Sequence, residues 1–284
     1  MLVVRSCWLL LLLWWGPLLC ACAQTSIQTL LTNGPVLNRF NIVVLSEGYT
    51  ADQLPQFRTD AANAVTSLLA HAPYQEYQGY VNAFALSVPS IQSGSDHPAK
   101  GIYRNTYFNS FYSDYLITMP TNSAGQGKVD ALLKSYLPQC HLAILLVNEP
   151  FYDGGSDGFA KTAIVSVSPM SAEILAHETG HVVAGLGDEY TDAYPGFPDL
   201  EEPNTTRETR PGFIKWKAWI PTNTPIPTPE TYDYSTAIGL FQGAHYHTAH
   251  WYRPKLDCAM RSQYVPFCEV CSEALVLSVY KKVR

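Results

Sequence analysis

The stretch that decides the fold is AHETGHVVAGLGDEY, residues 176–190. Within it, His177 and His181 bracket Glu178 in the spacing H-E-x-x-H. Because each residue of an α-helix turns by about 100°, two histidines four residues apart project from one face and can bind a single metal ion. The spacing predicts a helix over residues 171–186, with Ser171 as its N-cap.

The metal that this pattern favours is zinc. A catalytic zinc ion takes about three protein ligands and keeps one coordination position for water. His177 and His181 supply two ligands, and Glu178 lies one step round the helix, where it can take a proton from that water. The alternative is a pair of helical histidines bound to carboxylates on a solvated face, which fits poorly with the apolar residues around the motif.

The third zinc ligand is not fixed by the histidine spacing. In the long form of the motif a third histidine follows six residues after the second, and here that position is Gly187. Gly185 and Gly187 both accept the left-handed conformation that ends a helix, so the chain can turn back beneath the metal. Asp188 is then the first side chain able to bind zinc, and we expect it to complete the ligand set, with Glu189 as the near alternative.

Two more distant sets of ligands stay open. Glu201 and Glu202 fall where a glutamate from a second helix would approach, but FPDLEEPN, residues 197–204, is too short and too rich in proline to form one. The other set is the segment AHYHTAHW, whose spacing suits no single helix face and is more typical of a cleft wall. Its histidines are His245, His247 and His250.

The chain before the motif alternates between strands and helices. Apolar, β-branched runs predict buried strands over residues 39–50, 81–89 and 141–149. Helical spacing predicts helices over residues 51–72, with a capping box between Thr50 and Gln53, and over residues 128–137. An alternating run over residues 161–169, bounded by glycine and proline, is typical of an edge strand.

This order predicts an α/β fold with a mostly parallel twisted sheet over residues 24–190, ending in the active-site helix. Residues 191–284 are rich in proline and predict an irregular, loop-rich part that closes with a helix over residues 273–283. The length suits a single domain over residues 24–284.

The first 23 residues predict a signal peptide. They carry one positive charge, an apolar core and the exit sequence ACA, which predicts cleavage after Ala23. The protein is then secreted, extracellular or periplasmic; the alternative is a lipid anchor attached through Cys22 at the cell surface. No later segment is apolar enough to predict a transmembrane span. The formal charge of −6 argues against nucleic acid as a partner.

Four cysteines follow the signal peptide: Cys140, Cys258, Cys268 and Cys271. In an exported chain an even number predicts up to two disulfide bonds, with three possible pairings. The motif CEVC, residues 268–271, is alternatively a redox pair or half of a structural zinc site. Because no second C-x-x-C completes a four-thiolate site, we favour disulfides. The tripeptide NTT makes Asn204 a glycosylation acceptor if the host glycosylates.

The residues of the motif resemble a known family. HETGHVVAGLGDEY is similar to the signature of the IgA-peptidase family of secreted zinc metallopeptidases, H-E-x-G-H followed by a glycine-rich turn and D-E-Y. The resemblance extends over nearly all of the mature chain, although Glu47 stands where aspartate is commoner and Ala184 replaces the usual glycine. Further matching segments are VVLSEGYTADQLPQF, VPSIQSGSDHP, NTYF, VNEPFYDGGS, EEPN, KWKAW, FQGAHYHTAHWYRP, CAMRS and PFCEVC.

The resemblance implies a metzincin-like zincin fold. In such folds an antiparallel edge strand, here Lys161–Ser168, aligns an extended peptide substrate by backbone pairing. It also implies a methionine turn beneath the zinc, for which Met260 in CAMRS is the match; ordinary core packing is the alternative role.

The function predicted is zinc-dependent hydrolysis of peptide bonds in extracellular proteins or glycoproteins. Glu178 activates the water, and the oxyanion is stabilised by a phenolic or cationic donor, for which the candidates are Tyr264, Tyr252 and Arg253. We expect a monomer with one catalytic Zn²⁺; a structural Ca²⁺ is not demonstrable from the sequence. The alternatives are a catalytically lapsed surface protein that binds glycans or proteins, and a zinc hydrolase of non-peptide amides.

Overall fold

The computed structural model describes residues 24–113, 116–151, 154–155, 161–168 and 171–283. The predicted signal peptide, with the alternative lipid-attachment residue Cys22, lies outside these residues. Over the part that is described, none of the helices has the length and apolar character required to traverse a lipid bilayer.

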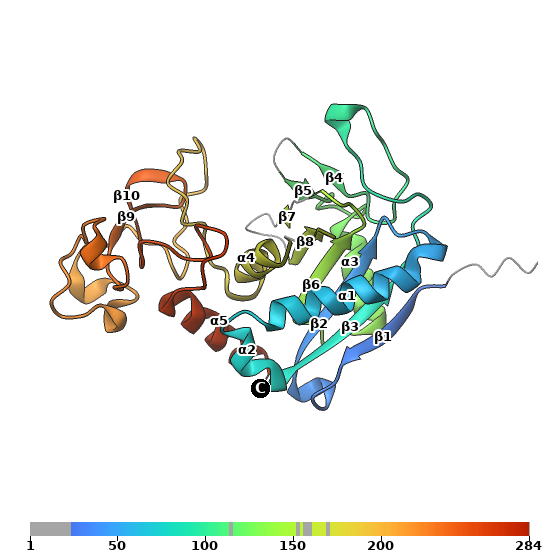
Figure 1. Cartoon of the computed structure of the whole chain (residues 1–284), viewed down its shortest axis with the longest axis horizontal. Helices are drawn as coiled ribbons and strands as arrows, with labels where there is room; N and C mark the ends of the chain where they lie inside the picture. Colours follow the sequence, from blue (N-terminus) through green and yellow to red (C-terminus); the bar gives the residue numbers. More distant parts are fainter. Residues whose placement is uncertain (1–23, 114–115, 152–153, 156–160, 169–170, 284) are drawn as a thin grey trace, which may run out of the picture.

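The centre of the fold is a six-stranded sheet (Figure 1). Its four inner strands run parallel to one another, and an antiparallel strand flanks them at each edge. The predicted α/β fold with a mostly parallel sheet is therefore confirmed. In spatial order the strands are β1 (Ser26–Leu31), β3 (Val81–Ser87), β2 (Phe40–Glu47), β6 (Leu142–Val147), β8 (Thr162–Ser166) and β7 (Gly154–Gly155).

The prediction of an antiparallel edge strand at Lys161–Ser168 is wrong. That segment forms β8, which pairs parallel to β6 on one side and antiparallel to β7 on the other, so it is an inner strand. All five residues of β8 are buried, and hydrophobic patterning does not distinguish an inner strand from an edge strand. The actual edge, β7, consists of two glycines and carries no hydrophobic signal. Strand β1 was also missed, because its partly exposed residues do not alternate.

Helices cover both faces of the sheet (Figure 1). Side chains of a strand alternate between faces, so Ile42 and Val44 of β2 pack with the buried residues of α1 (Leu54–Leu69), while Val43 and Leu45 pack with α3 (Gln126–Tyr136). The helix with the histidines, α4 (Ser171–Ala184), lies on the same face as α1. It begins at Ser171 itself, the residue predicted as its N-cap.

The predicted capping box between Thr50 and Gln53 is present, but α1 itself begins at Leu54, three residues after the predicted start. Thr50 precedes a short 3-10 turn, Ala51–Gln53, and the Gln53 side chain accepts a hydrogen bond from the Thr50 amide at 3.0 Å. The remaining 3-10 turns are Val36–Asn38, Gln78–Tyr80, Pro98–Lys100, Pro211–Phe213, Lys217–Trp219 and Tyr232–Tyr234. The remaining short elements of this part are α2 (Tyr74–Tyr77), β4 (Phe111–Tyr112) and β5 (Ile117–Thr118).

Two buried glutamates at the carboxyl ends of parallel strands hold the loops above the sheet. Glu47, the last residue of β2, accepts hydrogen bonds from the amides of Phe108 at 2.9 Å and Ser110 at 2.8 Å. Glu149, after β6, accepts one from the amide of Ser95 at 2.9 Å. Charge-assisted bonds of this kind satisfy loop amides that have no partner in a sheet.

The C-terminal part is loop-rich, as predicted, but it contains a hairpin that the sequence analysis missed. Its strands are β9 (Phe241–Ala244) and β10 (His247–Arg253), and the glycine and histidines in them obscured the strand pattern. The final helix, α5 (Glu269–Lys282), begins four residues before its predicted start. Figure 1 shows α4 between the sheet and the hairpin.

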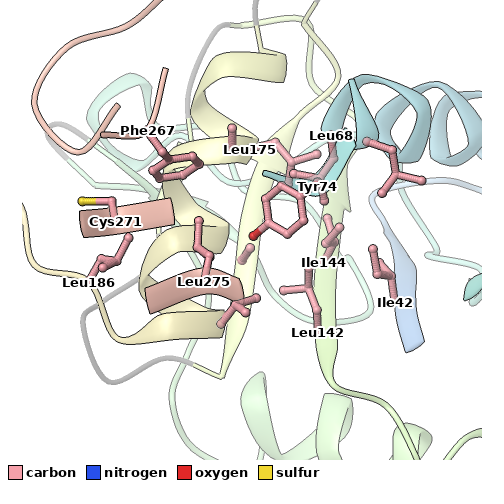
Figure 2. Close-up of a cluster of buried hydrophobic side chains, with 14 of the residues drawn as sticks. Ile42, Leu68, Tyr74, Leu142, Ile144, Leu175, Leu186, Phe267, Cys271 and Leu275 are labelled. Carbon is pink, nitrogen blue, oxygen red and sulfur yellow. The ribbon is translucent and has the colours of Figure 1, made fainter. Parts of the chain in front are cut away.

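A single hydrophobic cluster joins the sheet to the C-terminal part through α4. Figure 2 shows its members from β2, α1 and β6 on one side of α4 and Phe267, Cys271 and Leu275 on the other. The cluster also contains Trp216 and Leu240 from the loops, so the irregular part is anchored by the same core as the sheet.

The disulfide prediction is wrong, because all four cysteines of the described residues are free thiols. Cys140 packs with the cluster on the α3 face, while the other three lie on the opposite side of the sheet. The sulfurs of Cys258 and Cys271 are 3.6 Å apart, whereas a disulfide bond is about 2.05 Å long.

Candidate metal centre

Helix α4 brings its two histidines together. The Nε2 atoms of His177 and His181 lie 3.1 Å apart. On the far side of each ring, Nδ1 contacts a backbone carbonyl: that of Ala259 at 2.9 Å for His177, and that of Leu186 at 2.6 Å for His181. A carbonyl only accepts, so each Nδ1 carries a proton, and in the neutral imidazole each Nε2 presents its lone pair to the space between the rings.

The turn after α4 delivers a carboxylate to the same place. Gly185 has a φ of 63°, the left-handed conformation that a glycine adopts without strain. The chain then folds back, and Asp188 Oδ1 lies 3.0 Å from His177 Nε2 and 3.4 Å from His181 Nε2. Gly187 is needed for a different reason, because a Cβ there would lie 2.6 Å from the Glu202 carboxyl group.

The atoms of this histidine cluster, His177, His181 and Asp188, have the spacing of zinc ligands. Tetrahedral zinc with bonds of about 2.0–2.1 Å separates its N and O ligands by about 3.3 Å. The three separations observed, 3.0, 3.1 and 3.4 Å, match that value. Asp188 Oδ1 is buried, and the polar atoms that face it are the two imidazole Nε2 atoms. When both imidazoles are neutral, all three atoms are acceptors, and such a set suits a dication.

The charges of the cluster reinforce this fit. Burial alone would raise the pKa of Asp188, but the adjacent imidazoles of His181 and His177 outweigh burial and hold that pKa below its ordinary value. Burial likewise lowers the pKa of His181, yet the Asp188 carboxylate outweighs it and raises the pKa to about 9. Asp188 is thus an ionised carboxylate in a site largely shielded from solvent, and metal binding there displaces protons from the imidazoles.

Tyr246 supports Asp188 from the hairpin. Its hydroxyl donates to Asp188 Oδ2 at 2.7 Å, which leaves Oδ1 directed at the histidines. The amide of the neighbouring His245 donates to the Asp188 carbonyl at 2.9 Å. Sequence reasoning considered the histidines of this segment as ligands and missed Tyr246 between them, since a lone tyrosine carries no spacing signal.

Glu178 lies beside the histidine cluster on the wall of a pocket of about 500 Å³. Its side chain is 6% exposed, and Oε2 has no hydrogen-bond partner among the described residues. His177 and Tyr190 line the same pocket, and their rings stack with centroids 6.1 Å apart. An unpaired carboxylate oxygen beside a metal site is placed to accept a proton from a reactant in the pocket.

Met260 packs against α4 where the helix lacks a side chain. It is fully buried, and a Cβ on Gly180 would lie 2.8 Å from its sulfur. Its carbonyl accepts a hydrogen bond from the Glu189 amide at 2.8 Å, while the preceding residue, Ala259, holds His177. The glycine of H-E-x-G-H therefore makes room for the methionine, a requirement that the sequence alone did not reveal.

The alternative ligands lie elsewhere. Glu189 turns away from the histidines, and its Oε1 accepts a hydrogen bond from Asn204 at 2.9 Å. Glu202 is 3.0 Å from His245 Nδ1, and Glu201 pairs with Lys215 at 3.1 Å. Neither of the two metal-ligand groups found among the described residues includes Glu201, Glu202, His245, His247 or His250.

Asn204 is not a glycosylation acceptor in this fold. The side chain is fully buried, and its amide brackets Gly187, accepting from the Gly187 amide at 2.7 Å and donating to the Gly187 carbonyl at 2.8 Å. The N-x-T pattern was misleading because its asparagine holds the turn at Gly187, directly before Asp188 and Glu189.

The three candidate oxyanion donors occupy different positions. Arg253 is fully buried, and its guanidinium donates to Glu230 and to the carbonyls of Gln242 and Gly243. These bonds stabilise the hairpin and direct the guanidinium away from the pocket residues. Tyr252 is buried in the core cluster. Tyr264 is 63% exposed, and the residues on either side of it in the chain line the pocket.

One of three comparisons with known proteins identifies the family of this chain. The sequence profile of the family described as IgA peptidase M64 matches residues 28–234 and 230–279. Among solved structures, metalloproteinase-II from Bacteroides fragilis is similar to 57% of this chain, at 14% identity and a TM-score of 0.30. The similarity spans only 45% of that protein's length, and at this TM-score it carries no further conclusion. No curated protein matches the sequence.

Proposed function

We propose that this chain, which belongs to the IgA peptidase M64 family, is a secreted zinc-dependent endopeptidase. Its substrates would be extracellular proteins or glycoproteins. The observation that carries the proposal is the convergence of His177 Nε2, His181 Nε2 and Asp188 Oδ1 at zinc-ligand distances beside Glu178. The pocket of about 500 Å³ gives a substrate access to that position.

His177, His181 and Asp188 would hold the zinc ion. When bound, zinc supplies Lewis-acid activation of water and of the scissile carbonyl. The backbone carbonyls of Ala259 and Leu186 fix the imidazole tautomers, so the Nε2 atoms need no rearrangement before they bind. As a ligand, Asp188 would bring a negative charge to the metal, which a third histidine would not. The hydrogen bond that the Tyr246 hydroxyl donates to Oδ2 reduces the charge density on this carboxylate.

Glu178 would move the protons of the reaction. Its unpaired Oε2 accepts a proton from the attacking water and returns it to the amine that leaves. Because the carboxylate is nearly enclosed, few solvent molecules compete for that oxygen. The pocket wall around it contains the apolar side chains of Ile174, Val265 and Phe267, which suit an uncharged part of a substrate side chain.

Tyr264 is our candidate for the donor that stabilises the oxyanion. Of the three residues indicated by the sequence, it is the one whose chain neighbours, Gln263 and Val265, line the pocket. Its phenol is exposed and so could turn towards a bound substrate. Its loss would lower kcat more than it changes KM if the interaction forms in the transition state.

We also propose that residues 24–284 act as one catalytic domain after removal of residues 1–23. The continuous core cluster supports this, because it joins the sheet, α4 and the C-terminal loops. Met260 would then form the methionine turn beneath the metal. Its close packing against Gly180 of α4 supports this role.

The test is hydrolysis by the zinc-loaded mature chain and by Glu178→Ala. Cleavage of an unfolded protein should fall by about 10²–10⁴-fold in the variant, since a general base contributes that much, while bound zinc stays unchanged. The control is Glu76→Ala on α2, which should leave the rate nearly unchanged because Glu76 is exposed and does not line the pocket. Full activity of Glu178→Ala would refute the mechanism, and an inactive, zinc-loaded wild type would favour a lapsed binding protein.

A further inference from the structure

A second group of metal-ligand side chains lies behind the histidine cluster. Glu189 comes from the turn after α4, Cys258 from the loop before Met260, and Cys268 and Cys271 from the start of α5. One ligand atom from each residue lies within 4.8 Å of all the others, and all four residues are buried. We call this group the cysteine cluster; Figure 2 shows Cys271 beside Leu186 and Phe267, at the end of the core.

Two separations within the cysteine cluster match those of a tetrahedral site, and the others lie within 4.8 Å. Zn–S bonds of about 2.3 Å place two thiolates about 3.8 Å apart, and a thiolate about 3.6 Å from a carboxylate oxygen. The sulfurs of Cys258 and Cys271 are 3.6 Å apart, and the Cys271 sulfur is also 3.6 Å from Glu189 Oε1. Apolar packing alone does not explain a buried carboxylate among three thiols, whereas a metal site does.

The carboxylate gives an independent indication of a cation. Glu189 is fully buried, and its Oε2 has no hydrogen-bond partner among the described residues. A buried carboxylate is strongly unfavourable unless it is paired or binds a metal. Asn204 donates to Oε1 at 2.9 Å, and the Cys271 sulfur lies 3.6 Å from the same oxygen, so Oε2 is the atom that would gain a partner from a bound cation.

Donors around the sulfurs suit thiolates. The backbone amide of Cys268 donates to the Cys258 sulfur at 3.2 Å. The buried guanidinium of Arg253 interacts electrostatically with Glu189 and offsets part of the negative charge of the cluster. Hydrogen bonds and charges of this kind around the ligands strengthen metal sites.

We propose that Glu189, Cys258, Cys268 and Cys271 form a structural zinc site, separate from the catalytic metal. Three thiolates select a soft or borderline cation, and zinc suits a tetrahedral S₃O set. Four protein ligands leave no position for water, so the site is closed and has no catalytic role of its own.

The position of the site defines what it would stabilise. Cys258 immediately precedes Ala259, whose carbonyl fixes His177, and Glu189 immediately follows Asp188. The Glu189 amide also bonds to the Met260 carbonyl at 2.8 Å. One zinc ion would therefore link the turn after α4, the segment of Met260 and the start of α5. This link would fix the positions of the catalytic ligands.

The test is the zinc content of the purified mature chain. The wild type should carry two zinc ions, Cys268→Ser one, and the control Cys140→Ser two, because Cys140 lies on the other face of the sheet. Asp188→Ala should keep one ion whose cobalt derivative shows thiolate-to-metal charge-transfer absorption. That last result separates this site from the catalytic one, since it stands even if the histidine cluster binds no metal.

A measurement on the wild type alone covers the case in which Cys268→Ser does not fold. An organomercurial that titrates the thiols should release one zinc ion as the three cluster thiols react, and reaction of Cys140 should release none. A fully loaded wild type with one zinc ion and no thiolate–cobalt absorption would overturn the proposal. So would a Cys258–Cys271 disulfide in a non-reducing peptide map.

Discussion

The histidine cluster and the cysteine cluster are neighbours, because Asp188 belongs to the first and Glu189 to the second. They differ in solvent exposure and in the chain segments that supply their side chains. The side chains of His177, His181 and Asp188 are 14%, 9% and 15% exposed and adjoin a pocket, whereas the cysteine cluster is closed within the core. The first site takes all its ligands from one helix and the turn after it. The second collects them from three separate segments. An open set of three ligands suits chemistry, and a closed set of four suits stability.

The two clusters meet at a pair of consecutive carboxylates. Asp188 points to the histidines and Glu189 to the cysteines, because neighbouring side chains of a non-helical segment project to opposite sides. Asn204 holds this arrangement, since it bonds to the backbone of Gly187 and to the carboxylate of Glu189. Side chains one residue apart thus acquire different functions.

Neutralising each carboxylate in turn should have the largest effects, and it tests whether Asp188 and Glu189 belong to two separate metal sites. Asp188→Asn should abolish hydrolysis, because removal of a direct ligand weakens metal binding by more than the roughly 100-fold caused by loss of an outer partner. Its thiolate–cobalt absorption should persist. Glu189→Gln should alter that absorption and lower Tm by about 5–10 °C, since zinc bound about 100-fold more weakly stabilises the fold by about 2.7 kcal/mol less.

Metal analysis, cobalt spectra and thermal unfolding of the two variants check this pair of outcomes. If both variants lost the same single metal ion, the two carboxylates would serve one site and the comparison would fail.

A smaller effect is expected from the partner of Asp188. Tyr246→Phe removes the hydrogen bond to Oδ2 and keeps the ring, so the catalytic metal should bind about 10–100-fold more weakly. Chelator competition measures this affinity. The metal of the cysteine cluster should be unchanged, because the Tyr246 hydroxyl donates to Asp188 and not to Glu189. An equal loss at both sites would show that the hairpin acts through general stability.

The smallest effect is expected at the contact between α4 and the methionine segment. Gly180→Ala places a Cβ 2.8 Å from the Met260 sulfur, and such overpacking lowers the free energy of unfolding by about 1–3 kcal/mol. Alanine recovers up to about 1 kcal/mol through its higher helix propensity. Denaturant unfolding should show a net loss of about 1–2 kcal/mol. A net gain would mean that Met260 moves freely and does not brace the helix.

The histidine cluster could be predicted from the sequence because its information is local. Helical periodicity placed His177, Glu178 and His181, and glycine chemistry at Gly185 placed Asp188 within the following turn. The strands and helices of the parallel sheet were predictable for the same reason, since each is a continuous run with a clear period.

The cysteine cluster could not be predicted in that way. The proposed ligands Glu189 and Cys271 are 82 residues apart. The only sequence signal was CEVC, and without a second C-x-x-C it favoured disulfides. The position of β8 inside the sheet and the hydroxyl of Tyr246 beside Asp188 likewise depend on tertiary packing, which hydrophobic patterns do not encode.

On our proposal, the chain holds two metal ions, one on each side of the Asp188–Glu189 peptide. An anomalous difference map recorded above the zinc absorption edge from crystals of the wild-type protein tests it most directly. We expect two peaks, one bounded by His177, His181 and Asp188 and one by Glu189 and the sulfurs of Cys258, Cys268 and Cys271. A single peak, or continuous density between two of the sulfurs, would contradict the account.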